Sequence, residues 1–218
     1  MDMKVATLER IPAGQVHIEA MLEMPAKARS IVLFAHGSGS SRHSKRNQYV
    51  AKTLRNSGIG TLLMDLLTPE EDADYPTRFD IPLLTYRLLA ATNWIKNESQ
   101  ARSLPIGYFG ASTGAAAALQ AAAALNGEVG AVVSRGGRPD MAGVNNLEEV
   151  KSPTLLLVGG WDDEVIRLNR DAYEHLRCTK ELIIVPGATH LFMEPGTLEE
   201  VARQAVAWFN KYLITSSA

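Results

Sequence analysis

Short apolar runs alternate with amphipathic stretches along most of the chain. The runs are continuous, as expected for strands that are covered on both faces. Between several of them, apolar residues recur at spacings of three and four, as on the buried face of a helix. The alternation predicts an α/β fold with a mostly parallel sheet. The expected buried strands are Ile31–Ala35, Thr61–Met64, Pro105–Phe109, Ala131–Ser134, Thr154–Val158 and Leu182–Val185.

The stretches between these strands predict the helices. Capping residues, apolar spacing and alanine content place them at 44–57, 80–97, 115–125 and 168–176, with a last helix starting at Thr197. Residues 15–24 alternate partly between apolar and polar, which predicts an antiparallel strand at the edge of the sheet. The acidic segment from Leu66 to Phe79 is expected to be a loop and a candidate lid.

A serine lies between one predicted strand and the alanine-rich helix, in the sequence Gly110-Ala111-Ser112-Thr113-Gly114. G-x-S-x-G in this position is typical of a nucleophile elbow, a sharp turn that exposes the serine hydroxyl. Side chains at 110 and 114 would collide with the neighbouring strand and helix, and Ser112 is expected to be strained. The alternative is a turn of small residues that only lets the helix pack closely.

A serine hydroxyl needs a base, and the base needs a carboxylate that fixes its tautomer. Ser112 is followed along the chain by Asp162 and Asp163 after one strand, and by His190 after the last strand. Ser, Asp, His is the order found with this elbow. We expect Asp162 to be the acid because it comes first after its strand, with Asp163 capping the next turn. The alternative is a loop histidine bonded to backbone and two aspartates that are solvated turn residues or a helix cap.

The developing oxyanion of an acyl transfer needs backbone donors. The N–H of Thr113 directly follows the nucleophile, and the loop His36-Gly37-Ser38-Gly39 follows an earlier strand. We therefore expect the N–H groups of Ser38 and Thr113 to form the oxyanion hole.

Composition narrows the remaining possibilities. The 218 residues suit one domain over 1–218, and the net charge of −2 gives no general attraction to nucleic acid or membrane. The single cysteine excludes an internal disulfide, and the chain shows neither a signal-peptide layout nor a membrane-spanning apolar run. These features predict a cytoplasmic protein. The expected serine, histidine and aspartate chemistry acts on a small molecule and needs no metal or organic cofactor.

Four arginines follow strands or lie in loops that are expected to border the site: Arg42, Arg78, Arg135 and Arg138. One or more of them are candidates to bind an acidic group of the substrate. The alternative is that they are solvated or paired with nearby acids such as Asp140.

These motifs give the chain a resemblance to the α/β-hydrolases, and within them to the dienelactone hydrolase family. The resemblance covers about residues 15 to 213 and includes Gly160-Trp161-Asp162-Asp163-Glu164-Val165 and Pro186-Gly187-Ala188-Thr189-His190. It implies a sheet of about seven strands with helices on both faces, and it favours Asp162 because Val165 follows by three. Family members acting on dienelactone usually carry cysteine at the elbow, so Ser112 favours a general serine esterase. The chain also resembles hydrolase modules that are joined to phosphoribosyltransferase domains.

The predicted reaction is ester hydrolysis through an acyl-enzyme; thioesterases and peptidases share this machinery. One alternative is an acyltransferase or a binding protein on the same fold. Another is nucleotide binding at Gly37-Ser38-Gly39, with Asp65 as a ribose ligand, but Arg42 replaces the third glycine of that motif.

Overall fold

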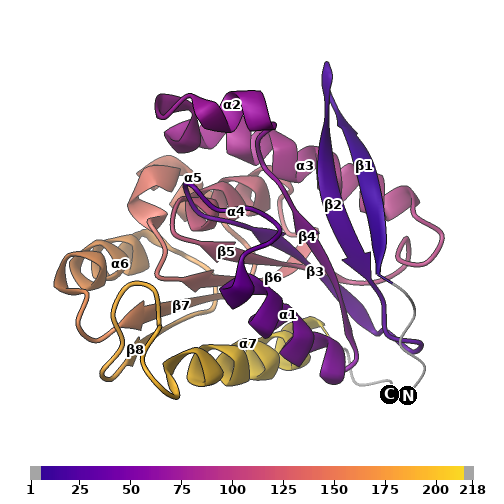
Figure 1. The fold of residues 1–218 in the computed structure, drawn as a ribbon. Helices are drawn as coiled ribbons and strands as arrows, with labels where there is room; N and C mark the ends of the chain where they lie inside the picture. Colours follow the sequence, from indigo (N-terminus) through magenta and orange to yellow (C-terminus); the bar gives the residue numbers. More distant parts are fainter. Residues whose placement is uncertain (1–5, 214–218) are drawn as a thin grey trace.

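The computed structural model describes residues 6–213, which form one eight-stranded sheet with helices on both faces (Figure 1). The strand order is β1-β2-β4-β3-β5-β6-β7-β8. The strands are β1 (Thr7–Ala13), β2 (Val16–Glu23), β3 (Ser30–Ala35), β4 (Ile59–Met64), β5 (Ile106–Ala111), β6 (Val129–Arg135), β7 (Thr154–Gly159) and β8 (Lys180–Val185).

All neighbouring pairs from β4 to β8 are parallel, whereas β2 pairs antiparallel with both β1 and β4. The predicted α/β fold with a mostly parallel sheet is confirmed. The prediction that residues 15–24 form the edge is wrong, because β1 lies outside β2. In β1 only Ile11 and Ala13 are buried, so its sequence carries little strand periodicity.

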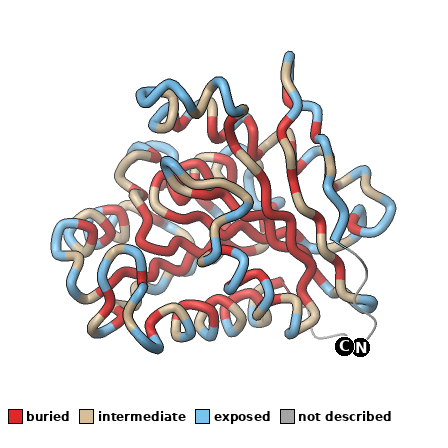
Figure 2. The backbone as a smooth tube through the Cα atoms, in the orientation of Figure 1, coloured by how far each residue is buried: buried red, intermediate tan, exposed pale blue. Residues whose placement is uncertain are grey.

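Within the described residues, two α-helices pack on one face of the sheet, and four pack on the other. The first face is covered by α1 (Lys45–Asn56) and α7 (Thr197–Leu213), whose apolar residues join one buried cluster. The second cluster contains side chains from α3 (Ile81–Asn97), α4 (Thr113–Ala124), α5 (Val144–Glu149) and α6 (Asp163–His175). Figure 2 shows the central strands buried between these layers.

Several segments differ from the sequence-based expectation. The acidic stretch after β4 contains α2 (Pro69–Ala73) and a short 3-10 helix, η1 (Pro76–Phe79), instead of an irregular loop; a capping box between Thr68 and Glu71 starts α2. A second 3-10 helix, η2, covers Pro139–Ala142. The helix α6 begins at Asp163, earlier than predicted, because Asp163 and Glu164 suit the positive end of a helix.

The parallel strands bring several loops together. Since β3, β5, β6, β7 and β8 run in one direction, the loops after Ala35, Ala111, Arg135, Gly159 and Val185 all leave from the same edge. This carboxyl edge holds the predicted site residues. Across residues 6–213, no helix has the length and apolar character to span a bilayer.

Candidate active site

Ser112 joins β5 to α4 in a conformation that non-glycine residues rarely adopt, with φ of 50° and ψ of −122°. A Cβ at Gly110 would lie 2.5 Å from the Ala115 Cα, and one at Gly114 would lie 2.2 Å from the Ala35 carbonyl oxygen. Both glycines are therefore required for the chain to turn this tightly against its own helix and against β3. The turn is a strained strand-to-helix elbow with Ser112 at its apex.

His190 and Asp162 are hydrogen-bonded to each other, with 2.7 Å between His190 Nδ1 and Asp162 Oδ2. Because a carboxylate can only accept, Nδ1 carries the proton and Nε2 is left as the basic nitrogen. Asp163 has an exposed side chain at the first position of α6. Of the two adjacent aspartates, Asp162 is the one that orients the histidine.

Contacts on both sides of His190 hold its loop in place. The Glu194 carboxylate accepts from the Thr189 N–H at 3.0 Å and from the Thr189 hydroxyl at 2.7 Å, and these bonds lower the pKa of Glu194. Phe192, at φ of 53°, is buried in the cluster beneath α1 and α7. His190 therefore lies between two fixed points of its loop: the hydrogen bonds of Thr189 with Glu194, and the buried ring of Phe192.

Ser112 and His190 both border the short segment after β6. The Ser112 N–H donates to the Arg135 carbonyl at 3.3 Å. A Cβ at the next residue, Gly136, would lie 3.1 Å from the His190 carbonyl oxygen and 3.6 Å from the His190 Cε1. Among the described residues, the Ser112 hydroxyl has no hydrogen-bond partner. The hydrogen bond between a nucleophilic serine and its histidine is often long before substrate binds.

The loop after β3 packs directly against the elbow. A Cβ at Gly37 would lie 2.9 Å from the Ser112 Cβ, which explains the glycine. The Ser38 N–H donates to the Thr113 hydroxyl at 3.0 Å, so the two expected oxyanion residues are in contact. In this arrangement the Ser38 N–H is engaged by a side chain, whereas Thr113, as the first residue of α4, leaves its N–H without an intrahelical partner.

His36 holds that loop in place. Its Nδ1–H donates to the Gly37 carbonyl at 2.9 Å, and its Nε2 accepts from the Leu66 N–H at 2.9 Å. Burial lowers the pKa of His36, so the ring is neutral at ordinary pH. The buried imidazole therefore ties the loop after β3 to the end of β4.

The four candidate arginines differ in their partners. Arg42 pairs with Asp65 and Glu19. Asp65 is therefore already engaged and is not free to bind a ribose, as the nucleotide-binding alternative requires. Arg78 pairs with Asp72 at 3.1 Å, and Arg138 pairs with Asp140 at 2.8 Å. Arg135 has no such acid: its Nε and Nη1 are buried without a hydrogen-bond partner among the described residues.

Sequence reasoning missed three apolar side chains near the acid and the base. Trp161 precedes Asp162 and is 68% exposed, while Leu191 and Met193 follow His190 and are also exposed. Because these exposed apolar side chains flank the acid and the base, they are candidates to contact a ligand. Their exposure is the signal, and the sequence alone does not provide it.

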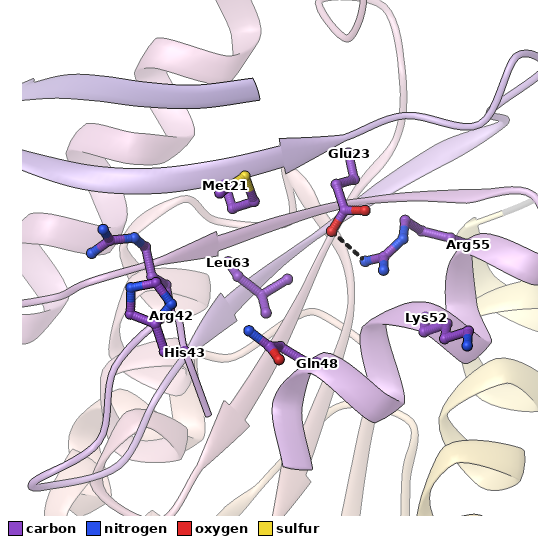
Figure 3. A pocket seen from close by; sticks show the side chains of 8 residues that line it. All are labelled: Met21, Glu23, Arg42, His43, Gln48, Lys52, Arg55 and Leu63. Carbon is purple, nitrogen blue, oxygen red and sulfur yellow. Dashed lines mark ion pairs between the residues drawn. The ribbon is translucent and has the colours of Figure 1, made fainter. Parts of the chain in front are cut away.

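A hollow of about 280 Å³ lies elsewhere, between α1 and strands β2 and β4 (Figure 3). It is lined by Met21, Glu23, Arg42, His43, Gln48, Lys52, Arg55 and Leu63, none of which belongs to the serine, histidine and aspartate set. Arg55 is already paired with Glu23 at 3.1 Å. Within residues 6–213, no cluster of three or more His, Cys, Asp or Glu side chains is arranged to bind a metal ion.

The fold and the elbow define an α/β-hydrolase. The family model of the dienelactone hydrolase family matches residues 18–213, and the chain belongs to this family. A crystal structure of dienelactone hydrolase from Anabaena variabilis is 52% identical, with a TM-score of 0.92 over 96% of this chain and 98% of that one. Est1E from Butyrivibrio proteoclasticus shares the fold, with a TM-score of 0.80 at 16% identity over 94% of this chain and 98% of that one.

Two curated relatives, from two strains of Mycobacterium tuberculosis, carry a different kind of name. Both are named putative phosphoribosyl transferase and are 55% identical over 204 residues, which is 94% of this chain. The match covers only 46% of each relative, so the chain spans about half their length.

Proposed function

We propose that the protein is a serine hydrolase that cleaves an ester-like bond of a small molecule through an acyl-enzyme. The observation that carries this proposal is the hydrogen-bonded His190–Asp162 pair on the carboxyl edge that also presents Ser112 at a strained elbow. The backbone strain at Ser112 has a purpose in this scheme, because it exposes the hydroxyl toward a substrate.

In the proposed reaction, His190 Nε2 takes the proton of Ser112 as its hydroxyl oxygen attacks the substrate carbonyl carbon. Asp162 holds the ring and stabilises the imidazolium that forms. The tetrahedral oxyanion is bound by the Thr113 N–H and by the Ser38 N–H, which exchanges the Thr113 hydroxyl for the substrate oxygen. His190 then protonates the leaving alcohol, and it activates a water molecule that hydrolyses the acyl-enzyme.

The apolar side chains of Trp161, Leu191 and Met193 are proposed to contact the substrate outside the reacting bond. They come from the two loops that supply the acid and the base, so a ligand bound there lies close to the chemistry. This surface favours an ester with an apolar portion over a wholly polar one.

Two alternatives use the same residues or the same edge. An acyl-enzyme would also form in an acyltransferase, where an acceptor other than water takes the acyl group. The name of the curated relatives suggests phosphoribosyl transfer, which requires a phosphate cradle. The Gly37-Ser38-Gly39 loop is the candidate cradle, but its Gly37 packs on Ser112, and Arg42 stands where a dinucleotide-binding motif has its third glycine.

The test is hydrolysis of a panel of para-nitrophenyl esters by the wild type and Ser112→Ala, together with labelling by a fluorophosphonate. We expect Ser112→Ala to lose both the esterase activity and the label. Ser103→Ala is the matched control, because Ser103 is exposed and lies just before β5, at the opposite edge of the sheet. Full hydrolysis by Ser112→Ala would reject the proposal, and acyl transfer to an added alcohol without hydrolysis would favour the acyltransferase.

A further inference from the structure

Arg135 lies directly beside the elbow. In the parallel pairing of β5 with β6, Arg135 is opposite Ala111, the residue before Ser112, and its carbonyl accepts from the Ser112 N–H. Side chains alternate along a strand, so Arg135 points to the same face as Val133, the face covered by α1 and α7. Its side chain therefore lies under α1 and α7, on the strand next to the one that leads into the elbow.

The guanidinium of Arg135 is buried without compensation. The residue is 6% exposed, and neither Nε nor Nη1 has a partner among the described residues. Burial and the positive charge of Arg46 lower the pKa of Arg135 to about 10, which leaves it charged at neutral pH. A buried charge without a counter-ion destabilises a folded protein, so its presence calls for a ligand that neutralises it.

Arg46 supplies a second cation from α1. Its Nε is also buried without a partner, and no described acid forms an ion pair with it. At about 100° per residue, Arg46 lies on the flank of α1 opposite Gln48 and Lys52. Those two residues line the hollow over β2 and β4 (Figure 3). In the strand order, β2 lies on one side of β4, and β3, β5 and β6 follow on the other side. Arg46 is therefore on the flank of α1 that is nearer to β6 and Arg135.

The start of α1 adds to the positive potential. Lys45 and Arg46 occupy its first turn, which contains no acidic residue. The N-terminal end of a helix carries a partial positive charge and ordinarily favours anions there. Arg46 is close enough to Arg135 for its charge to lower the pKa of Arg135, and the helix end next to Arg46 has the same sign. Arg42, Arg78 and Arg138 are already paired with carboxylates.

We propose that Arg46 and Arg135 form a subsite for an oxyanion group, a carboxylate or a phosphate, carried by the substrate of Ser112. This inference rests on the proposed hydrolase and specifies its substrate class. An oxyanion at this position would accept charge-assisted hydrogen bonds from both guanidinium groups. It would hold the ester beside Ser112 and His190, since Arg135 is one residue from the Gly136 backbone that borders His190.

The first experiment compares esters that differ in charge: para-nitrophenyl hemisuccinate, its neutral methyl ester, and para-nitrophenyl phosphonoacetate. We expect the ratio of kcat/KM for the charged over the neutral ester to fall about 10- to 100-fold in Arg46→Met and in Arg135→Met. Arg102→Met is the matched control and keeps the wild-type ratio, because Arg102 is exposed and precedes β5 at the other edge. A larger loss on the phosphonate identifies phosphate as the group, and a larger loss on the hemisuccinate identifies carboxylate.

The second experiment measures thermal unfolding of Ser112→Ala with succinate or inorganic phosphate, so that binding is read without turnover. We expect one of the anions to raise the Tm, and the rise to vanish when Arg135→Met is added. Without anion, Arg135→Met should unfold at the same or a higher temperature, because an unpaired buried cation is removed. A lower Tm would indicate a structural role and overturn the subsite.

The two proposals fail in different ways. Unchanged charge ratios in the arginine variants, without any anion-dependent rise of Tm, reject the subsite and leave the serine hydrolase intact. Hydrolysis that survives Ser112→Ala rejects the hydrolase scheme, whereas the anion-dependent Tm still reports on Arg46 and Arg135.

Discussion

The backbone N–H of Ser38 donates to the side-chain hydroxyl of Thr113 at 3.0 Å, across 75 positions of sequence. This bond fixes the distance between the loop after β3 and the elbow. In the proposed reaction the Ser38 N–H leaves this hydroxyl and donates to the oxyanion. The Thr113 side chain therefore holds the loop after β3 beside the elbow until the substrate binds.

Replacing Thr113 by valine should lower kcat for a neutral para-nitrophenyl ester about three- to tenfold, because the loop that carries Ser38 is then held less firmly beside the elbow. Valine keeps the shape of threonine but leaves Ser38 without its partner. Thr113→Ser retains a hydroxyl and should recover most of the loss. Equal kcat values for Thr113→Val and the wild type would show that the bond has no positioning role.

The adjacent aspartates provide a matched pair. Asp162→Asn should reduce kcat about 10³- to 10⁴-fold, because an amide no longer fixes the Nδ1–H tautomer of His190. Asp163→Asn makes the same chemical change one residue later, on an exposed side chain, and should remain close to the wild type. Steady-state kinetics on one ester checks both variants, and similar losses in the two would contradict the assignment of Asp162.

Gly136 separates Arg135 from the rest of its loop and touches His190. It has φ of 49°, and an alanine Cβ there would lie 3.1 Å from the His190 carbonyl oxygen. Gly136→Ala should therefore lower activity more than its loss of stability explains, since His190 is displaced. Gly127→Ala introduces the same kind of backbone strain at φ of 94°, and its nearest neighbour is the Lys151 Cβ at 3.8 Å.

We expect both glycine variants to lose about 1 kcal/mol of unfolding free energy, the typical cost of alanine in this backbone region. Only Gly136→Ala should also lose kcat, measured well below its Tm. If Gly127→Ala loses as much activity, the effect of Gly136→Ala is general destabilisation.

Stability should depend on pH through His36. Burial lowers the pKa of His36 in the folded state, whereas the unfolded chain binds a proton near the ordinary value of about 6.5. As the pH falls below that value, the unfolded state takes up a proton that the folded state does not. The free energy of unfolding should therefore decrease by up to about 1.4 kcal/mol per pH unit until the folded-state pKa is reached.

His36→Gln cannot take up that proton and should show a shallower pH dependence between neutral and mildly acidic solution. Urea unfolding of both proteins at several pH values measures the difference, and the other histidines are common to both. The variant also loses part of the bonding to Gly37 and Leu66, so it should be less stable at neutral pH. Parallel pH profiles for the two proteins would contradict this role of His36.

The sequence by itself determined the layered α/β fold and the position of the elbow. Short continuous apolar runs bounded by turn residues favour strands covered on both faces. The glycines at 110 and 114 lie where an added Cβ would come within 2.5 Å and 2.2 Å of neighbouring backbone atoms. The strand pattern and the close contact between Gly110 and Ala115 are local, because they depend on residues close together in the chain, whereas the approach of Gly114 to Ala35 follows from the G-x-S-x-G motif. The edge strand β1 escaped prediction because only two of its residues are buried.

Only the tertiary structure decided which charges are compensated and which donors are engaged. Arg42, Arg78, Arg135 and Arg138 look alike in sequence, yet three have carboxylate partners, and the partners of Arg42, Glu19 and Asp65, are each 23 residues away. Arg135 is left buried beside Arg46, which no sequence pattern had singled out. Electrostatic pairing depends on distances across the sheet and between its covering helices, and those distances are set only when the strands are aligned in register.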